Sequence, residues 1–311
     1  MEIIGNTLLV SQNSVLARDL LLAGGYSQDD ADKTVAATGF ESLSRFEATS
    51  VTDLLSQNKD AFKAQIDRVS EPIRAVIAVT QTNSQKIPNA ASLLHSILDL
   101  EPSALCIELV DGCNGFVKSL VLADRVLKEG EVGVIFAGDI NSDMVRNSPA
   151  GTSALFGDGF ALTLVRKSGQ FESAVMQDGS KGGAIRYGVS DPKLHMDGLA
   201  VYAFSSRSVP TLLQRSWRKE FSDTSYPVFH QASQLIVNHL SQKLGISSLS
   251  YRPFNAGNVG NLGAASIPGW MATEVDVSIG SEMVCVGFGA GLSWGFANIR
   301  WAAEENRTIR L

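Results

Sequence analysis

The sequence predicts a layered α/β fold made of two similar halves that pack as one body. Strand-like and helix-like segments alternate along all 311 residues, which is the pattern of sheets covered by helices. Residues 104–130 combine a buried strand, a tight turn at Cys113 and a long amphipathic helix. The segment around His230 has the same order of strand, single residue and helix. No linker or low-complexity stretch separates the halves, so they are expected to share one core.

Local patterns predict the elements of the first half. Phe116, Leu120, Ala123 and Leu127 recur at helical spacing behind Cys113 and mark one helix face. Acidic residues after Ser27 indicate a helix N-terminus, and short apolar runs that end in turn residues indicate buried strands. Expected strands cover residues 1–4, 75–80, 104–110, 133–138 and 160–165, and expected helices cover residues 13–24, 50–65, 89–98 and a segment from about residue 27.

The pattern starts again around residues 166–170, so we divide the chain into residues 1–166 and 167–311. Pro210 must begin or kink a helical segment, because proline lacks the backbone donor of a helix interior. Expected strands cover residues 173–177, 184–187, 226–229, 283–288 and 292–299, and expected helices cover residues 195–217, 264–273 and a segment through residues 235–240.

Composition describes an ordinary globular protein. Hydrophobic residues make up 44% and charged residues 19% of the chain, and the net charge of −6 argues against nucleic acid as the main partner. No apolar stretch reaches membrane-spanning length, and the N-terminus lacks the basic region of a signal peptide. The three cysteines lack framework spacing, which favours a reducing cytoplasm. None of the four histidines pairs with a cysteine at metal-ligand spacing, so no metal is expected.

Cys113 is the strongest candidate for a nucleophile. A thiol at a helix N-terminus lies near unpaired N–H groups and the positive end of the helix dipole, which favour the thiolate. Gly112 and Gly115 remove side chains on both sides and would let a substrate approach the sulfur. A small core cysteine is the alternative, and this stretch alone does not separate the two.

Two further segments could carry chemistry. His230 follows a predicted strand directly, although a single histidine is more often a core or cap residue. Residues 258–268 form a Gly/Asn-rich loop that runs into a helix, which simple turn chemistry also explains. The glycines of residues 287–291 lack the helix and acid of a dinucleotide site and fit a backbone that approaches a ligand with bare N–H groups.

Together these segments resemble the thiolase superfamily, and within it the β-ketoacyl-[acyl-carrier-protein] synthase III group, over essentially the whole chain. The motifs occur in the family's order: DGCNGF at 111–116, LFGDG at 155–159, HQA at 230–232, GNLGAASIP at 260–268 and FGAGLSWG at 288–295. The separation of Cys113 from His230 is somewhat short, which implies a trimmed segment between residues 179 and 203. The resemblance implies a five-layered α-β-α-β-α fold of two pseudo-symmetric halves.

The resemblance also implies residue roles. Cys113 would carry the acyl group as a thioester, and His230 and Asn261 would stabilise the enolate formed when a malonyl-type thioester loses CO₂. Backbone N–H groups of Cys113 and Ala290 would form the oxyanion hole, with Ala290 at a position where the family usually has glycine. Ile87, Phe156 and Gly289 would line the substrate pocket, and Ile87 would reach into the pocket of a neighbouring subunit.

The implied function is a decarboxylating condensing enzyme of fatty-acid-like or specialised (polyketide) biosynthesis, with no cofactor besides its acyl thioester substrates. Positions that hold coenzyme A in the family fall on Lys33, Ala37 and Ala150. The basic positions that dock carrier protein fall on Ala203, Leu235 and Gln242, which leaves only Lys243. Acyl-coenzyme A or an acyl or malonyl carrier protein is the expected substrate, but neither the family's usual nucleotide contacts nor its usual carrier docking is expected. A homodimer, or a heterodimer with a related subunit, is expected. Two alternatives are an acyltransferase that moves the acyl group from Cys113 to an oxygen or nitrogen acceptor, and a non-catalytic partner subunit.

Overall fold

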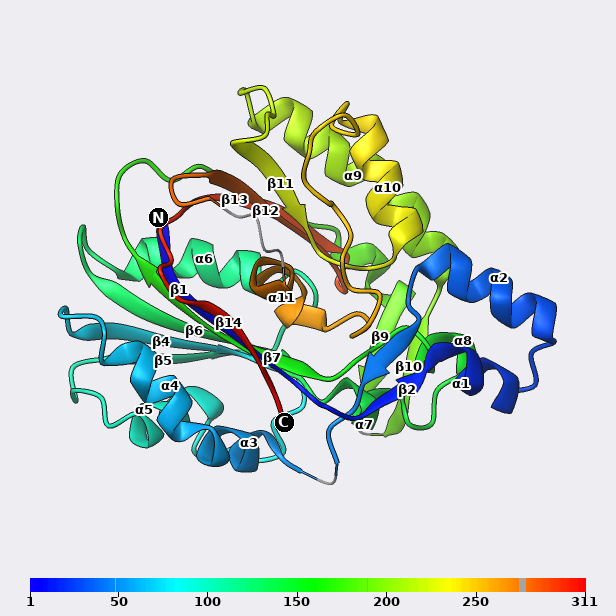
Figure 1. The fold of residues 1–311 in the computed structure, drawn as a ribbon, viewed down its shortest axis with the longest axis horizontal. Coiled ribbons are helices and arrows are strands. Elements are labelled where there is room, and N and C mark those ends of the chain that lie inside the picture. Colours follow the sequence, from blue (N-terminus) through cyan, green and yellow to red (C-terminus); the bar gives the residue numbers. More distant parts are fainter. Residues whose placement is uncertain (48, 189, 274–277) are drawn as a thin grey trace.

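The computed structural model describes residues 1–47, 49–188, 190–273 and 278–311, and its centre is a mixed sheet built in two parts (Figure 1). The first part contains β1 (Glu2–Val10), β4 (Ile73–Val79), β5 (Leu105–Leu109), β6 (Val132–Asp139) and β7 (Gly159–Arg166) in the order β5-β4-β6-β7-β1. The second contains β8 (Ser173–Gln177), β11 (Ser225–Phe229), β12 (Glu282–Gly289) and β13 (Ser293–Trp301) in the order β11-β12-β13-β8. The two parts meet where the start of β1 pairs with β13, and β14 (Asn306–Arg310) runs parallel to β1 beyond that point.

Helices complete five layers, as predicted. α3 (Val51–Gln57), α4 (Lys59–Ile66) and α5 (Ala90–Ile97) cover the outer face of the first part, and α9 (Gly198–Ser216) and α10 (Gln234–Lys243) cover that of the second. α6 (Gly115–Val126) and α11 (Ser266–Thr273) lie between the two parts. The middle layer holds Phe116 and Trp270, both buried, and each contributes a large apolar surface to the shared core.

The remaining elements gather at one end of the layers (Figure 1). They are α1 (Ala17–Ala23), α2 (Gln28–Thr38), α7 (Asn141–Val145), α8 (Ala150–Ser153), the hairpins β2 (Ser14–Leu16) with β3 (Ser42–Ser44) and β9 (Ile185–Gly188) with β10 (Asp191–Met196), and the 3₁₀ turns η1 (Gly179–Ala184) and η2 (Gly263–Ala265). None of the helices within the described part of the chain has the length and apolar character needed to cross a membrane.

The order of the strands corrects the internal match between Cys113 and His230. Within the large sheet, β5 is the third strand of the first half, after β1 and β4. Cys113 follows β5 and precedes the central helix α6. His230 follows β11, which lies beside β12 as β4 lies beside β6. β11 therefore corresponds to β4, the second strand of the large sheet in the first half. Asn261, which precedes the central helix α11, is therefore the topological counterpart of Cys113. The repeat is real, but it pairs Cys113 with Asn261.

Three boundaries differ from the sequence expectation. His195 lies in strand β10, and the helix begins only at Gly198. Pro210 lies inside α9, and Lys243 Nζ donates to the Ser206 carbonyl (3.2 Å) that a backbone N–H at residue 210 would have bonded. The expected helix over 50–65 is divided at Asn58, which caps α4.

Candidate active site

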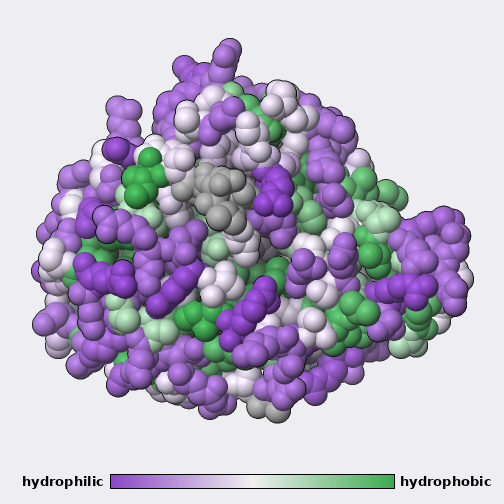
Figure 2. Space-filling view, in the orientation of Figure 1, coloured by the Kyte–Doolittle hydropathy of each residue, from purple (hydrophilic) through white to green (hydrophobic). Residues whose placement is uncertain are grey.

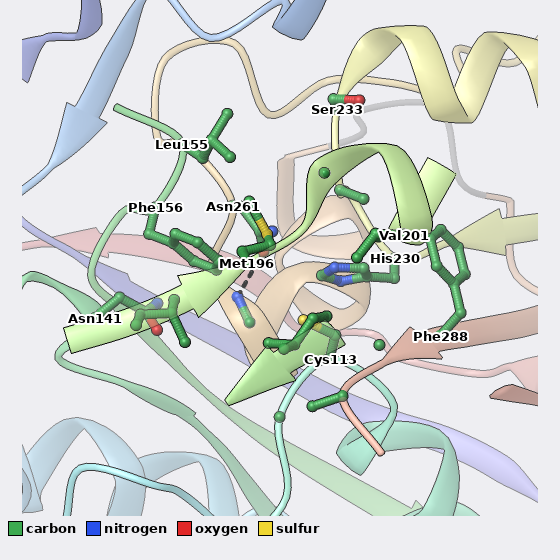
Figure 3. A pocket seen from close by; sticks show the side chains of 18 of the residues that line it. Cys113, Asn141, Leu155, Phe156, Met196, Val201, His230, Ser233, Asn261 and Phe288 are labelled. Carbon is green, nitrogen blue, oxygen red and sulfur yellow. Dashed lines mark hydrogen bonds between the residues drawn. The ribbon is translucent and has the colours of Figure 1, made fainter. Parts of the chain in front are cut away.

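A cavity of about 850 Å³ opens where β5, β11 and β12 end, and it collects most of the predicted site residues (Figure 3). Cys113, Phe156, His230, Asn261, Gly289 and Ala290 all line it. Ile87 does not; its side chain is 91% exposed on the surface of the protomer. The ends of strands from both halves therefore build one site.

Cys113 stands on a sharp turn between β5 and α6. Gly115 N donates to the Gly112 carbonyl at 2.7 Å, which closes the turn, and α6 begins at Gly115. On the opposite side, the end of β12 packs against the cysteine, because a Cβ added to Gly289 would lie 2.8 Å from Cys113 Cβ. Only a residue without a side chain fits at position 289.

The state of the Cys113 thiol differs from the sequence expectation. Burial raises the pKa of Cys113 to about 12, with smaller contributions from the carboxylates of Asp111 and Asp139. Cys113 lies before the first residue of α6, and the helix dipole does not offset the loss of hydration. The prediction of a ready thiolate is wrong for the unliganded cavity, where the thiol is protonated at neutral pH.

The other two cysteines have different environments. Cys285 is fully buried in β12, and burial raises its pKa. Cys106 is half-buried in β5, at the edge of the sheet, and burial raises its pKa as well. Cys106 is therefore partly accessible in the single protomer.

His230 is held as a neutral imidazole. Its backbone N–H donates to the Val286 carbonyl (2.8 Å) and its ring meets Phe288 edge to face at 5.4 Å. Burial lowers the pKa of His230 to about 3, and hydrogen bonding with the Gly263 backbone opposes this only in part. Within the described part of the chain, Nδ1 of the ring is buried without a hydrogen-bond partner, and His230 lines the cavity.

Asn261 has a defined amide orientation. Its Oδ1 accepts from Gly263 N (2.9 Å) and from Ser266 Oγ (3.3 Å), which leaves Nδ2 as a donor (Figure 3). Its backbone N–H donates to the Leu155 carbonyl, and its carbonyl accepts from Gly157 N. The 155–159 segment of the first half thereby fixes the asparagine of the second.

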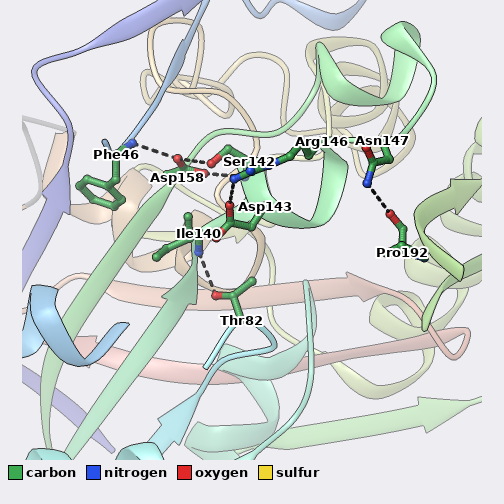
Figure 4. A network of polar contacts seen from close by, with 9 residues as sticks. All are labelled: Phe46, Thr82, Ile140, Ser142, Asp143, Arg146, Asn147, Asp158 and Pro192. Carbon is green, nitrogen blue, oxygen red and sulfur yellow. Dashed lines mark hydrogen bonds and ion pairs between the residues drawn. The ribbon is translucent and has the colours of Figure 1, made fainter. Parts of the chain in front are cut away.

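A buried carboxylate holds that segment in turn (Figure 4). Asp158 accepts from Ser142 N (2.7 Å), Ser142 Oγ (2.8 Å) and Phe46 N (3.0 Å). Burial raises the pKa of Asp158, whereas these bonds and the charge of Arg45 lower it. Arg45 also donates to the Phe156 carbonyl (2.6 Å), so the wall of the cavity is tied down by ionic and backbone contacts.

The sequence reasoning missed a second buried carboxylate, Asp139, at the end of β6. Its Oδ1 accepts from Thr80 Oγ1, Gln81 N, Thr82 N and Thr82 Oγ1 at 2.5–3.1 Å. These bonds fix the turn after β4, where Gln81 lines the cavity beside Gly112. An acid at the carboxyl end of a predicted strand was the available signal.

Much of the cavity wall is apolar and comes from elements that the sequence did not single out. The hairpin β9–β10 contributes Ile185, Leu194 and Met196, and the start of α9 contributes Leu199 and Val201. Leu199 is 79% exposed and marks the mouth. Such a wall suits a hydrocarbon chain or the linear part of a thioester arm.

Comparison with known proteins agrees with this geometry. The profile of 3-oxoacyl-[acyl-carrier-protein (ACP)] synthase III matches residues 107–180, and the profile of its C-terminal domain matches residues 213–301, which together span just over half of the chain. The chain belongs to this family. The ketosynthase III resemblance, based on the motifs from Cys113 to Gly295, is therefore confirmed.

Individual relatives extend over most of the ketosynthase III fold. The β-ketoacyl-[acyl-carrier-protein] synthase III of Lactococcus lactis is 29% identical over 255 residues, covering 74% of this chain and 78% of its own. The Streptococcus pneumoniae enzyme is 29% identical over 278 residues, covering 81% and 85%. The 3-oxoacyl-(acyl-carrier protein) synthase of Burkholderia xenovorans superposes with a TM-score of 0.88 at 26% identity, covering 100% of this chain and 97% of its own.

This ketosynthase III lacks free cations at the positions that the resemblance assigns to donor recognition. Lys33 pairs with Asp29 at 2.5 Å, and Ala37 and Ala150 carry no charge. Among the carrier-docking positions, Leu235 is 53% exposed, and Lys243 donates to the Ser206 carbonyl. The only cations at these seven positions, Lys33 and Lys243, therefore already have partners.

Proposed function

We propose that the protein is an acyl-thioester condensing enzyme in which Cys113, His230 and Asn261 perform the chemistry. The observation that carries the proposal is the amide orientation of Asn261. With Oδ1 occupied by Gly263 and Ser266, Nδ2 is a hydrogen-bond donor in the cavity that Cys113 and the neutral His230 also line. Two neutral donors suit an enolate, which carries negative charge only after CO₂ has left.

In the first step the Cys113 sulfur attacks the carbonyl of an acyl thioester. The acyl group moves to the sulfur, and the thiol proton leaves with the departing thiol. Backbone N–H groups of Cys113 and Ala290 would stabilise the oxyanion, since Gly289 brings that turn into contact with the nucleophile. Because the free thiol has a raised pKa, Cys113 reacts only once a thioester lies in the cavity.

In the second step a malonyl-type thioester loses CO₂ beside the acylated cysteine. His230 and Asn261 hold the thioester oxygen of the resulting enolate, whose carbon attacks the acyl carbonyl on Cys113. The new carbon–carbon bond gives a β-keto product, and the sulfur is released as the thiolate. No residue is needed to remove a proton from carbon, because the loss of CO₂ itself generates the enolate.

Mass spectrometry tests both steps. The intact protein is incubated with an acyl thioester and then with either a malonyl thioester or an alcohol or amine acceptor. We expect one acyl group per protomer on Cys113 and its conversion to a β-keto product by the malonyl thioester only. Conversion by the alcohol or amine alone would identify an acyltransferase, and an inert Cys113 would identify a partner subunit. Cys113→Ser is the blank for loading.

We also propose that two protomers join through β5. This strand is an edge of the sheet, and Leu105 and Val110 at its ends are 49% and 75% exposed. Exposed apolar edge strands pair readily with another copy. Ile87, 91% exposed, would then enter the partner's cavity. Light scattering at micromolar concentration should give the mass of a dimer, and a monomer would contradict the proposal.

The free thiol chemistry fits a reducing compartment, for which we propose the cytoplasm.

A further inference from the structure

One part of the apolar cavity carries a polar side chain that the proposed chemistry does not use. Asn141, the first residue of α7, is 1% exposed and lines the cavity. Its Nδ2 donates to the Gly157 carbonyl at 2.6 Å, which fixes the orientation of the amide. The remaining polar atom of this amide is the acceptor Oδ1, which has no hydrogen-bond partner among the described residues.

A second oxygen without a partner borders the same space. Asp139 is fully buried, and its Oδ2 has no partner among the described residues although Oδ1 accepts four bonds. A Cβ built on Gly263 would lie 3.6 Å from Asp139 Oδ2 and 3.7 Å from Asn141 Oδ1. Gly263 has φ +58° and no side chain, so both oxygens face its bare Cα, and Gly263 and Asn141 line the cavity. We call the space between these three residues the niche.

The niche lies next to the proposed reaction centre. Gly263 N donates to the Asn261 amide oxygen at 2.9 Å, and Asp139 is close enough to Cys113 to act on its pKa through charge. A group placed in the niche would therefore belong to the first carbons of an acyl chain on Cys113, and not to its far end. An amide acceptor without a donor is an unusual neighbour for a saturated hydrocarbon.

Resting on the proposed function, we infer that the acyl group carried by Cys113 bears a hydroxyl or amino group within about three carbons of its carbonyl, and that Asn141 selects it. A donor in the niche would satisfy Asn141 Oδ1 and come near Asp139 Oδ2. A plain acyl chain would leave the Asn141 acceptor facing hydrocarbon, which costs more than the hydrogen bond gains. Sites built to bond a substrate hydroxyl discriminate strongly against analogues that lack it.

The test compares pantetheine thioesters of butyrate, 2-hydroxybutyrate, 3-hydroxybutyrate and 3-aminobutyrate. The rate of Cys113 acylation is followed by intact mass at several concentrations to give kcat/KM. We expect at least one hydroxy- or amino-substituted donor to exceed butyryl by about tenfold or more. Asn141→Leu should bring that ratio to unity or below. Met144→Leu, on the same wall, should leave the ratio unchanged.

Equal kcat/KM values for all four donors in the wild-type protein would overturn the inference and mean that the niche holds only water. A preference that survives in Asn141→Leu would overturn the role of Asn141. Thermal unfolding shows whether Asn141→Leu is folded. The comparison of donors in the wild-type protein decides the substrate class even if that variant does not fold. Failure of every donor to acylate Cys113 would instead contradict the proposed function, so the two failures are distinguishable.

Discussion

Gly289 and Cys113 are in direct contact across the two halves of the molecule. A Cβ at position 289 would lie 2.8 Å from Cys113 Cβ and 3.4 Å from its Sγ. The end of β12 therefore forms the floor beneath the nucleophile, and the following residue, Ala290, lines the cavity at the same level. The proposed oxyanion hole depends on this contact, since it sets the distance between the two backbone segments that would supply its N–H groups.

Substitution of Gly289 by alanine should disable Cys113. The added methyl group must displace the cysteine or the end of β12, and overpacking of this kind destabilises a core by about 1–3 kcal/mol. We expect acylation to fall by about a hundredfold or more, because the sulfur moves away from the oxyanion donors. Thermal unfolding and intact mass after incubation with an acyl thioester measure both effects. Gly179→Ala, where the added Cβ meets no atom within 4 Å, is the matched control. Normal acylation of Gly289→Ala would contradict the assigned contact.

Asn261→Asp should separate the two steps of the reaction. The aspartate keeps an oxygen for Gly263 N and Ser266 Oγ but replaces the Nδ2 donor by an acceptor. Loss of one such donor elsewhere costs about a hundred- to a thousandfold in rate, and we expect a decrease of that size in decarboxylation. Cys113 acylation should change by less than about tenfold. Ser266→Ala removes only the 3.3 Å bond and should have little effect on either step. Equal losses in both steps would refute the division of roles.

The buried Asp139 should make stability decrease with pH. Burial raises its pKa from 3.8 to about 7, so between these values the folded state holds a proton that the unfolded state has lost. The stabilisation is complete below the pKa of Asp139 in the unfolded state and is lost as the pH rises through its pKa in the folded state. From about pH 5.5 to about pH 8.5, this one group should lower the free energy of unfolding by roughly 2 kcal/mol.

Urea unfolding of the wild type and of Asp139→Asn at both pH values measures that contribution. In Asp139→Asn, the free energy of unfolding should no longer fall by the amount attributed to Asp139 between these pH values. In Asp143→Asn, a control at a side chain that is 50% exposed, it should fall as in the wild type. Identical pH dependence in wild type and Asp139→Asn would mean that Asp139 titrates normally in the folded protein.

The nucleotide end of coenzyme A should contribute little to donor recognition. Stacking rings and arginine forks usually hold that end, whereas Lys33 is already paired with Asp29 and Ala37 and Ala150 offer no charge. We expect acyl-pantetheine and acyl-coenzyme A of matched chain length to acylate Cys113 with kcat/KM values within about tenfold of each other. A hundredfold advantage for coenzyme A would reveal a nucleotide site built from other residues.

The sequence was sufficient to predict the elements that carry the site. The apolar run before Asp111 and the helical spacing behind Cys113 predicted the strand, turn and helix that the structure contains. The segments around His230 and Asn261 were identified by motif, and both residues line the cavity with Cys113. The five layers followed from the resemblance, since alternation of strands and helices alone indicates only a layered α/β fold.

What the sequence missed depends on contacts between distant segments. Residues 191–196 have no clear alternation, and their pairing with β9 makes them a strand. Pro210 is tolerated inside α9 because Lys243 of α10 bonds the carbonyl it leaves free. Asn141 resembles an ordinary residue after a strand until Gly157 and Gly263 are placed beside it. The pKa of Cys113 likewise depends on burial and on Asp139, which is distant from it in the chain.

Release of labelled CO₂ tests the central claim most directly. Protein acylated on Cys113 is mixed with a malonyl thioester labelled in its free carboxyl group, and the CO₂ released is compared with the acyl group lost from the protein. We predict one CO₂ and one β-keto thioester for each acyl group removed from Cys113. The Asn261→Asp variant should form both products at a rate roughly a hundredfold lower. Loss of the acyl group without CO₂ release would contradict a decarboxylating condensing enzyme.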